Sequence, residues 1–184
     1  ANCGVKVSLD GQGADEIFGG YDYYIRDYIS SLFHSKKFKL AANLCGAALD
    51  SNKISRIDVM KSLLPTSLIK RLSNLNTRRI YTERFYQPLN SNGNFKPSDE
   101  SLTEINTNLS QDRKLVATLR YSVQEGPLQS ILRTMDRNSM WSSCENRVPF
   151  LNQNIAEFAF SLPESFLISS TGQGKEILKS SMKD

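Results

Sequence analysis

Apolar residues recur at the spacing of an α-helix in the last third of the chain. This spacing places an apolar side chain every three or four residues, so that one face of each helix can be buried. The repeating sets are Leu115, Leu119 and Val123; Leu128, Ile131, Leu132 and Met135; and Ile155, Phe158, Ala159 and Leu162. Gly126 and Pro127 separate the first two predicted helices, and Pro163 ends the third.

A β-strand is predicted near the N-terminus, where residues 4–9 carry alternating valines and are followed by turn residues. No second strand of equal quality is found, and a lone strand leaves its edges unpaired. Residues 55–65 and 65–73 predict short helices around Pro65, and the Asn-, Gly- and Pro-rich residues 87–99 predict a loop. We therefore expect either a nearly all-helical protein or a piece of a larger α/β protein whose other strands lie upstream.

The composition is that of an ordinary globular domain. Of the 184 residues, 39% are hydrophobic and 23% are charged, which is sufficient for one hydrophobic core. The sequence has no run of about 18 apolar residues and no signal-peptide pattern at its N-terminus. We expect no association with a membrane.

Cysteine and histidine usage argues against several kinds of site. Cys3, Cys45 and Cys144 are far apart and odd in number, which disfavours a zinc site and a disulfide framework. A reducing, cytoplasmic setting is therefore expected. His34 is the only histidine, and because no nucleophile motif surrounds it, we interpret it as a surface or packing residue.

Basic side chains are concentrated in the middle of a chain whose net charge is +4. They are Lys36, Lys37, Lys39, Lys53, Arg56, Lys61, Lys70, Arg71, Arg78, Arg79 and Arg84. We interpret them as solvated helix faces. The alternative is a nucleic-acid surface, but neither interleaved aromatic residues nor a zinc finger or recognition-helix pattern supports it, so no nucleic-acid partner is expected.

A glycine turn follows the predicted strand within residues 7–24, VSLDGQGADEIFGGYDYY. Gly11 and Gly13 permit positive φ angles and a close approach of a ligand to the backbone. Free N–H groups at the start of the next helix attract anions. Asp15 and Glu16 fall in the first turn of that helix, where they either complement the helix dipole or hold Mg²⁺ together with the phosphates of a nucleotide.

Three stretches resemble signatures of the glutamine-hydrolysing asparagine synthetases. Residues 9–21, LDGQGADEIFGGY, resemble the family motif Ser-Gly-Glu-Gly-Ala/Ser-Asp-Glu-Leu-Phe-Gly-Gly-Tyr. Residues 132–152, LRTMDRNSMWSSCENRVPFLN, resemble its Asp-Arg-x-Ser-Met … Glu-x-Arg-Val-Pro-Phe-Leu-Asp signature. Residues 172–182, GQGKEILKSSM, resemble its Gly-x-Lys-x-x-Leu-Arg segment. The stretches follow the family's order and spacing, whereas residues 30–110 match in helical character only.

The resemblance implies an α/β parent fold, a parallel sheet with flanking helices of the adenine nucleotide α-hydrolase type. Residues 1–184 would be the C-terminal portion of its ATP-dependent synthetase domain, mostly α-helical with about one strand. The implied reaction joins aspartate to ATP as β-aspartyl-AMP and then transfers glutamine-derived ammonia to give asparagine. The implied cofactors are ATP and Mg²⁺, and the partners are these small-molecule substrates. A homodimer is a further expectation, because the bare strand edge leaves open a pairing between two copies of the chain.

The resemblance also assigns a nucleotide site. Gly11 and Gly13 match backbone positions at the nucleotide, Asp15 matches the acid that binds Mg²⁺ and pyrophosphate, and Tyr21 closes the same motif. Lys175 matches a lysine that grips phosphates and stabilises the charge that develops on them. A lysine at a helix start is slightly disfavoured by the helix dipole, which strengthens the functional interpretation of Lys175.

The second signature carries two more catalytic candidates, Arg137 and Glu145, which match polar groups at the active site and the ammonia route. Glu145 and Arg147 lie two residues apart, so in an extended segment they share one side. We favour a structural ion pair for them, because a buried arginine needs a partner whatever its function. Met140 and Trp141, in the same signature, are predicted to be core residues.

Two departures from the family pattern limit the resemblance. Gln12, a further catalytic candidate, stands where the family has a glutamate; its amide cannot act as a base but keeps the hydrogen-bonding reach. Asp10 replaces a serine and is a candidate source of the missing charge. In addition, the pyrophosphate loop Ser-Gly-Gly-x-Asp-Ser and a glutaminase domain with an N-terminal cysteine are not found in these 184 residues, so we expect the isolated chain to be inactive.

These departures keep other interpretations open. One is a related enzyme that adenylates another carboxylate, such as a β-lactam synthetase or a cell-surface sugar-modifying amidotransferase. Another is a non-catalytic helical scaffold that keeps the motifs for packing.

Overall fold

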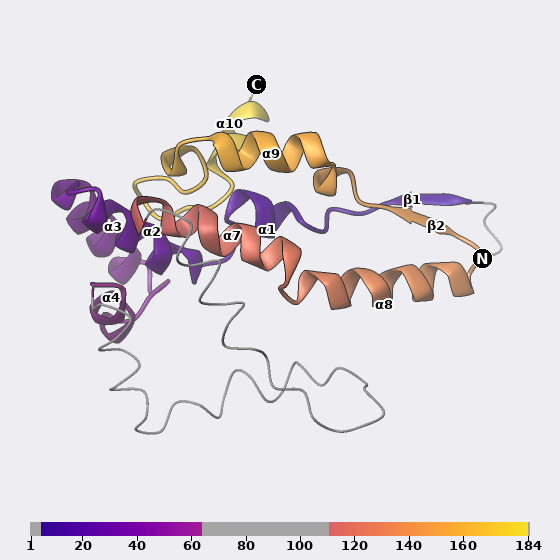
Figure 1. The fold of residues 1–184 in the computed structure, drawn as a ribbon, viewed down its shortest axis with the longest axis horizontal. Helices are drawn as coiled ribbons and strands as arrows, with labels where there is room; N and C mark the ends of the chain where they lie inside the picture. The colour runs from indigo at the N-terminus through magenta and orange to yellow at the C-terminus, as the bar shows by residue number, and fades with distance from the viewer. Residues whose placement is uncertain (1–4, 64–110, 184) are drawn as a thin grey trace.

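The structure is a computed structural model that describes residues 5–63 and 111–183. Its first part comprises β1 (Val7–Leu9), α1 (Ala14–Phe18), α2 (Tyr24–His34), α3 (Phe38–Asp50) and α4 (Arg56–Leu63). Its second part comprises η1 (Gln111–Arg113), α7 (Lys114–Gln124), α8 (Leu128–Trp141), β2 (Glu145–Arg147), η2 (Pro149–Leu151), α9 (Gln153–Ser161), η3 (Glu164–Phe166) and α10 (Glu176–Ser181). Figure 1 shows their arrangement.

Most of the predicted elements are confirmed. The strand near the N-terminus and the three periodic helices are present as β1, α7, α8 and α9, and α4 falls within the predicted helix at residues 55–65. The predicted helix at residues 65–73 and the predicted loop at residues 87–99 lie outside the described residues. None of the helices in the described part of the chain has the length and apolar character needed to cross a bilayer.

The prediction of a single strand was incomplete, because β2 pairs with β1 in parallel. The register places Val7 beside Glu145 and Leu9 beside Arg147. Backbone bonds extend the pairing at both ends, from Glu145 N to Lys6 O and from Asp10 N to Arg147 O, each at 2.8 Å. The strand β2 was missed because Glu-Asn-Arg has no apolar alternation, and backbone pairing rather than side-chain burial stabilises it.

The hydrophobic core lies in the helical body, where α2 packs against α3, α4 and α7. Its fully buried side chains include Ile25 and Ile29 of α2, Leu44 of α3 and Leu115 of α7. Tyr24 is also buried, and its hydroxyl donates to Ser122 Oγ at 2.9 Å. Helix α7 buries the apolar face that its repeat predicts, whereas α2 and α3 were not singled out in the sequence.

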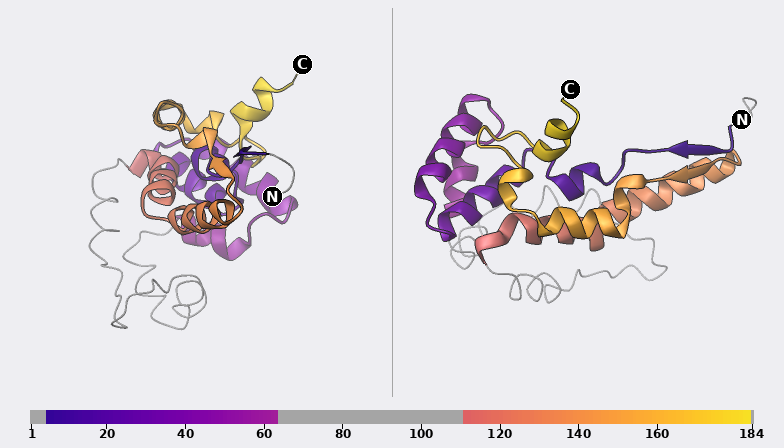
Figure 2. Two further views of the ribbon diagram at one scale, coloured as in Figure 1. Left: turned by 90° about the vertical axis from the view of Figure 1, so that its right-hand side faces the viewer. Right: turned by 90° about the horizontal axis from the view of Figure 1, so that it is seen from above.

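The strands and α8 form an arm that extends away from this helical body (Figure 1), as the view from above also shows (Figure 2, right). The prediction that Met140 and Trp141 are core residues was wrong, since their exposed fractions are 57% and 92%. They lie at the far end of α8, and no described residue covers the indole of Trp141. Val7 and Leu9 of β1 are exposed as well.

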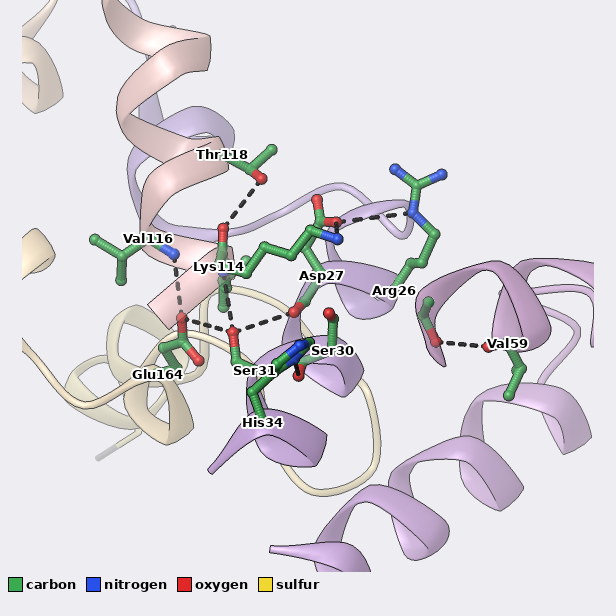
Figure 3. A network of polar contacts seen from close by, with 12 residues as sticks. Arg26, Asp27, Ser30, Ser31, His34, Val59, Lys114, Val116, Thr118 and Glu164 are labelled. Atoms are coloured by element: carbon green, nitrogen blue, oxygen red, sulfur yellow. Dashed lines mark hydrogen bonds and ion pairs between the residues drawn. The ribbon is translucent and has the colours of Figure 1, made fainter. Parts of the chain in front are cut away.

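A polar network is buried between α2, α7 and η3 (Figure 3), and no sequence pattern predicted it. Glu164 Oε1 accepts hydrogen bonds from Val116 N and from Ser31 Oγ, both at 3.2 Å. Burial raises the pKa of Glu164 to about 7, although these two donors and Arg113 oppose the shift. Asp27 is buried nearby, 3.9 Å from Lys114 Nζ, and burial raises its pKa too. The network therefore joins three helical segments at the cost of burying two carboxyl groups.

Gly13→Ala is expected to destabilise the fold by about 2 kcal/mol. Gly13 has a φ of 88°, which an L-residue adopts only with strain, and an added Cβ would collide with the Leu151 side chain. The free energy of unfolding, measured by urea denaturation, checks this. Gly46→Ala is the matched control, because Gly46 lies inside α3 with open space around it and alanine favours helix there. Equal stability of the two variants would contradict the account.

Candidate functional site

The turn between β1 and α1 is held by its own backbone. Asp10 Oδ1 accepts a hydrogen bond from Gln12 N at 3.1 Å, and Ala14 N donates to Gly11 O at 3.3 Å. Gly13 adopts the expected positive φ, whereas Gly11 does not. A Cβ at Gly11 would meet nothing within 4 Å, so the backbone at Gly11 is open to solvent on that side.

The structure brings Asp15 and Lys175 together from opposite ends of the sequence. Asp15 lies in the first turn of α1, and Lys175 caps α10 with a φ of 57°. Lys175 Nζ lies 2.8 Å from Asp15 Oδ1, and the two side chains are 31% and 35% exposed. The backbone of Lys175 is fixed as well, because its N–H donates to Phe18 O at 3.1 Å. The first and third motifs therefore meet in a charged pair that solvent can reach.

Two glycines allow this approach. A Cβ at Gly20 would collide with Asp15 Oδ1 and would lie 2.6 Å from Lys175 Cε. A Cβ at Gly174 would collide with the carbonyl oxygen of Gly19. Gly174 is therefore required for backbone packing. The sequence signal for this close approach is the pair Gly19-Gly20 and the Gly-x-Gly pattern at residues 172–174.

Tyr21 and Glu16 form a second contact beside this pair. Tyr21 Oη donates to Glu16 Oε1 at 3.0 Å, and the Tyr21 ring stacks on Tyr23 with centroids 5.4 Å apart. Burial, and then the hydrogen bond to Glu16, raises the pKa of Tyr21 above its ordinary value of 10.0. Glu16 is 5% exposed, so of the two adjacent acids only Asp15 is accessible to a ligand.

The catalytic candidates of the second motif lie on the arm. Arg147 Nε donates to Glu145 Oε1 at 3.0 Å, and both side chains are mostly exposed. The ion pair is as expected, but the assumption that Arg147 is buried was wrong. Arg137 is exposed on α8. Within residues 5–63 and 111–183, no hydrogen bond or ion pair joins Arg137 or Glu145 to Asp15 or Lys175. Their assignment stays a prediction.

Gln12 is half-buried in the β1–α1 turn. The Asp10 carboxylate beside it accepts the Gln12 backbone N–H, so Asp10 has a structural task in the turn. The idea that Asp10 supplies the charge that Gln12 lacks stays a prediction as well.

The donor set around Asp15 fits a cation that arrives with a polyphosphate. In the described part of the chain, no group of three or more His, Cys, Asp or Glu side chains could hold a metal ion. A magnesium–nucleotide complex needs only one or two protein carboxylates, because phosphate oxygens and water complete the octahedron. Asp15 meets that need, and the Lys175 ammonium beside it complements phosphate charge.

Comparison with known proteins gives one finding. A family model described as asparagine synthase matches residues 1–184. Neither the curated proteins nor the solved structures gave a significant match. The family model spans all three motifs, so the resemblance noted in the sequence is confirmed. The family comprises ATP-dependent ligases that act on small molecules, and ATP use is consistent with the accessible Asp15–Lys175 pair. The chain belongs to the asparagine synthase family.

Proposed function

We propose that Asp15 and Lys175 bind the polyphosphate of ATP during adenylation of a carboxylate substrate. The observation that carries this proposal is the 2.8 Å contact between Lys175 Nζ and Asp15 Oδ1 in a position that solvent reaches. A structural salt bridge at the surface would contribute little to stability. Two fixed opposite charges fit a magnesium–phosphate ligand better, because the acid faces the cation and the lysine faces the phosphate oxygens.

The proposed substrate is aspartate. Its side-chain carboxylate attacks the α-phosphorus of ATP, the bond from that phosphorus to the bridging oxygen breaks, and pyrophosphate leaves. Ammonia derived from glutamine then displaces AMP and gives asparagine. The first step needs positive charge at the leaving group rather than a base, because a carboxylate is already a nucleophile at neutral pH.

The residues assigned to the nucleotide site each have a task in this proposal. Lys175 binds phosphate oxygens and stabilises the charge on the departing pyrophosphate. Asp15 would hold Mg²⁺, which neutralises phosphate charge when bound. The open backbone at Gly11 would let the ligand approach closely, and Gly13, with its positive φ, precedes the first turn of α1 that carries Asp15. Tyr21 donates a hydrogen bond to Glu16 and so orients the residue next to Asp15.

Pyrophosphate binding tests the site. We expect the chain to bind magnesium pyrophosphate in isothermal titration calorimetry, and K175M to bind about tenfold to a hundredfold more weakly, since a charge-assisted hydrogen bond contributes about 1.5–3 kcal/mol. K179M is the control, because it removes an exposed lysine from the same helix, α10. Equal binding by wild type, K175M and K179M would remove the basis for the proposal.

Gln12 favours a second candidate function within the same class, a ligase that adenylates a carboxylate other than aspartate. The family's glutamate at this position is absent, which supports an altered acceptor as in the β-lactam synthetases or the cell-surface sugar-modifying amidotransferases. Pyrophosphate release by the longer protein that contains this chain, screened over carboxylates and amines, separates the two. Release dependent on aspartate supports the asparagine reaction, and release with another carboxylate only supports the alternative.

A further inference from the structure

Lys53 lies in the turn that follows α3, and its side chain reaches the loop that precedes Lys175. Lys53 Nζ donates to the carbonyl oxygen of Gly172 at 2.8 Å and lies 4.0 Å from Asp22 Oδ1. Asp22 follows Gly20 closely in the chain, and Gly172 comes shortly before Lys175. One ammonium group therefore joins the segment after Asp15 to the segment before Lys175.

The Gly172 loop is seated on the helical body. Gly172 is buried and has a φ of 74°. A Cβ at this position would lie 3.4 Å from Ile25 Cδ1 of α2 and 3.6 Å from Leu44 Cδ1 of α3. Lys53 supplies a charged donor to a carbonyl at this buried position, an interaction about twice as strong as a neutral hydrogen bond.

The same loop is closed at its base, so a displacement at Gly172 reaches Lys175. Gly172 N donates to Ser169 O at 3.0 Å, and an isolated antiparallel bridge pairs Ile168 with Gly174. Gly174 in turn packs directly against Gly19. A closed loop of this length has little freedom to absorb a shift at one residue without moving its neighbours.

We propose that Lys53 is a positioning residue that sets the place of Lys175 for binding of a diphosphate group. This inference rests on the proposed function, since the diphosphate is the group that Asp15 and Lys175 bind. Lys53 does not touch the ligand in this account. It acts through the Gly172 carbonyl and holds the Lys175 ammonium within reach of both Asp15 and the phosphate oxygens.

Variants of the chain test the proposal with magnesium pyrophosphate as the probe. K53M is expected to weaken binding about tenfold, which corresponds to about 1.4 kcal/mol, and K53R, which keeps a charged donor, to restore most of it. K39M is the matched control, because Lys39 is an exposed lysine of α3 without a recorded hydrogen bond or ion pair in the described residues. In a second measurement the chain is labelled with ¹³C-lysine, and the NMR signal of Lys175 Cε is followed. This signal is assigned by its loss in K175M.

Positioning predicts that K53M shifts the Lys175 Cε signal before ligand is added, whereas K39M leaves that signal unchanged. Wild-type binding by K53M, with binding lost in K175M, would overturn the role of Lys53 and leave the proposed function intact. Absence of pyrophosphate binding in wild type would overturn the proposed function itself. The NMR spectrum of the wild type gives a test that does not depend on the folding of K53M. If the Lys53 Cε signal shifted on addition of pyrophosphate as much as that of Lys175, Lys53 would be a direct ligand, and the positioning role would be wrong.

Discussion

Gly20→Ala is expected to abolish pyrophosphate binding while the fold is retained. The added methyl group would collide with Asp15 Oδ1 and lie 2.6 Å from Lys175 Cε, so both charged side chains must move. Loss of two charge-assisted interactions amounts to about 3–6 kcal/mol, which corresponds to at least a hundredfold loss of affinity. This effect exceeds that of K175M because a single methyl group displaces both members of the pair.

The fold is expected to survive because the atoms displaced by the Gly20 substitution belong to flexible side chains. The φ of Gly20 lies outside the left-handed region, so alanine fits the backbone. Gly174→Ala is the matched comparison, since its Cβ would collide with the Gly19 backbone carbonyl. We expect G174A to lower the melting temperature strongly and G20A to leave it within a few degrees of wild type, both measured by circular dichroism.

Calorimetry with magnesium pyrophosphate completes the Gly20 experiment. Wild-type affinity in folded G20A would show that the positions of Asp15 and Lys175 are irrelevant to the ligand, and the proposed site would then be wrong. A melting temperature as low as that of G174A would instead show that Gly20 is required for backbone packing.

The sequence predicted helices better than strands, for a physical reason. The helices α7, α8 and α9 each repeat apolar residues at helical spacing, and that repeat is local in the sequence. The strand β2 depends on pairing with β1 from the other end of the chain, and its three residues are polar. The exposed Trp141 was misassigned for a related reason, because hydrophobicity alone does not show which neighbours reach the end of a helix.

Only those parts of the site that lie within short sequence motifs could be predicted. The glycine turn pointed to Asp15, the resemblance assigned Lys175 to the same nucleotide site, and the structure places the two side chains 2.8 Å apart. The roles of Gly20 and Lys53 were not foreseen. Both depend on which backbone or side-chain atoms lie opposite them in space, and spacing along the chain does not contain that information.

The buried network around Glu164 leads to the second large prediction, which concerns stability as a function of pH. Burial raises the pKa of Glu164 from 4.5 to about 7 in the folded state. The folded protein therefore retains a proton that the unfolded chain releases, so the free energy of unfolding falls as the pH rises from about 4.5 to about 7. The contribution of this group amounts to about 3 kcal/mol, and buried Asp27, whose pKa is also raised by burial, acts in the same direction.

Glu164→Gln is expected to remove most of this dependence. The amide oxygen still accepts the hydrogen bonds from Val116 N and Ser31 Oγ, and the side chain carries no charge to be desolvated. The variant should match wild type near pH 4.5 and exceed it by up to about 3 kcal/mol at pH 8, measured by urea unfolding across that range. Glu125→Gln, at an exposed position, should stay within about 0.5 kcal/mol of wild type. If the free energy of unfolding of E164Q fell with pH as steeply as that of wild type, the Glu164 carboxyl group would not be the source of the pH dependence. Its hydrogen bonds alone do not titrate.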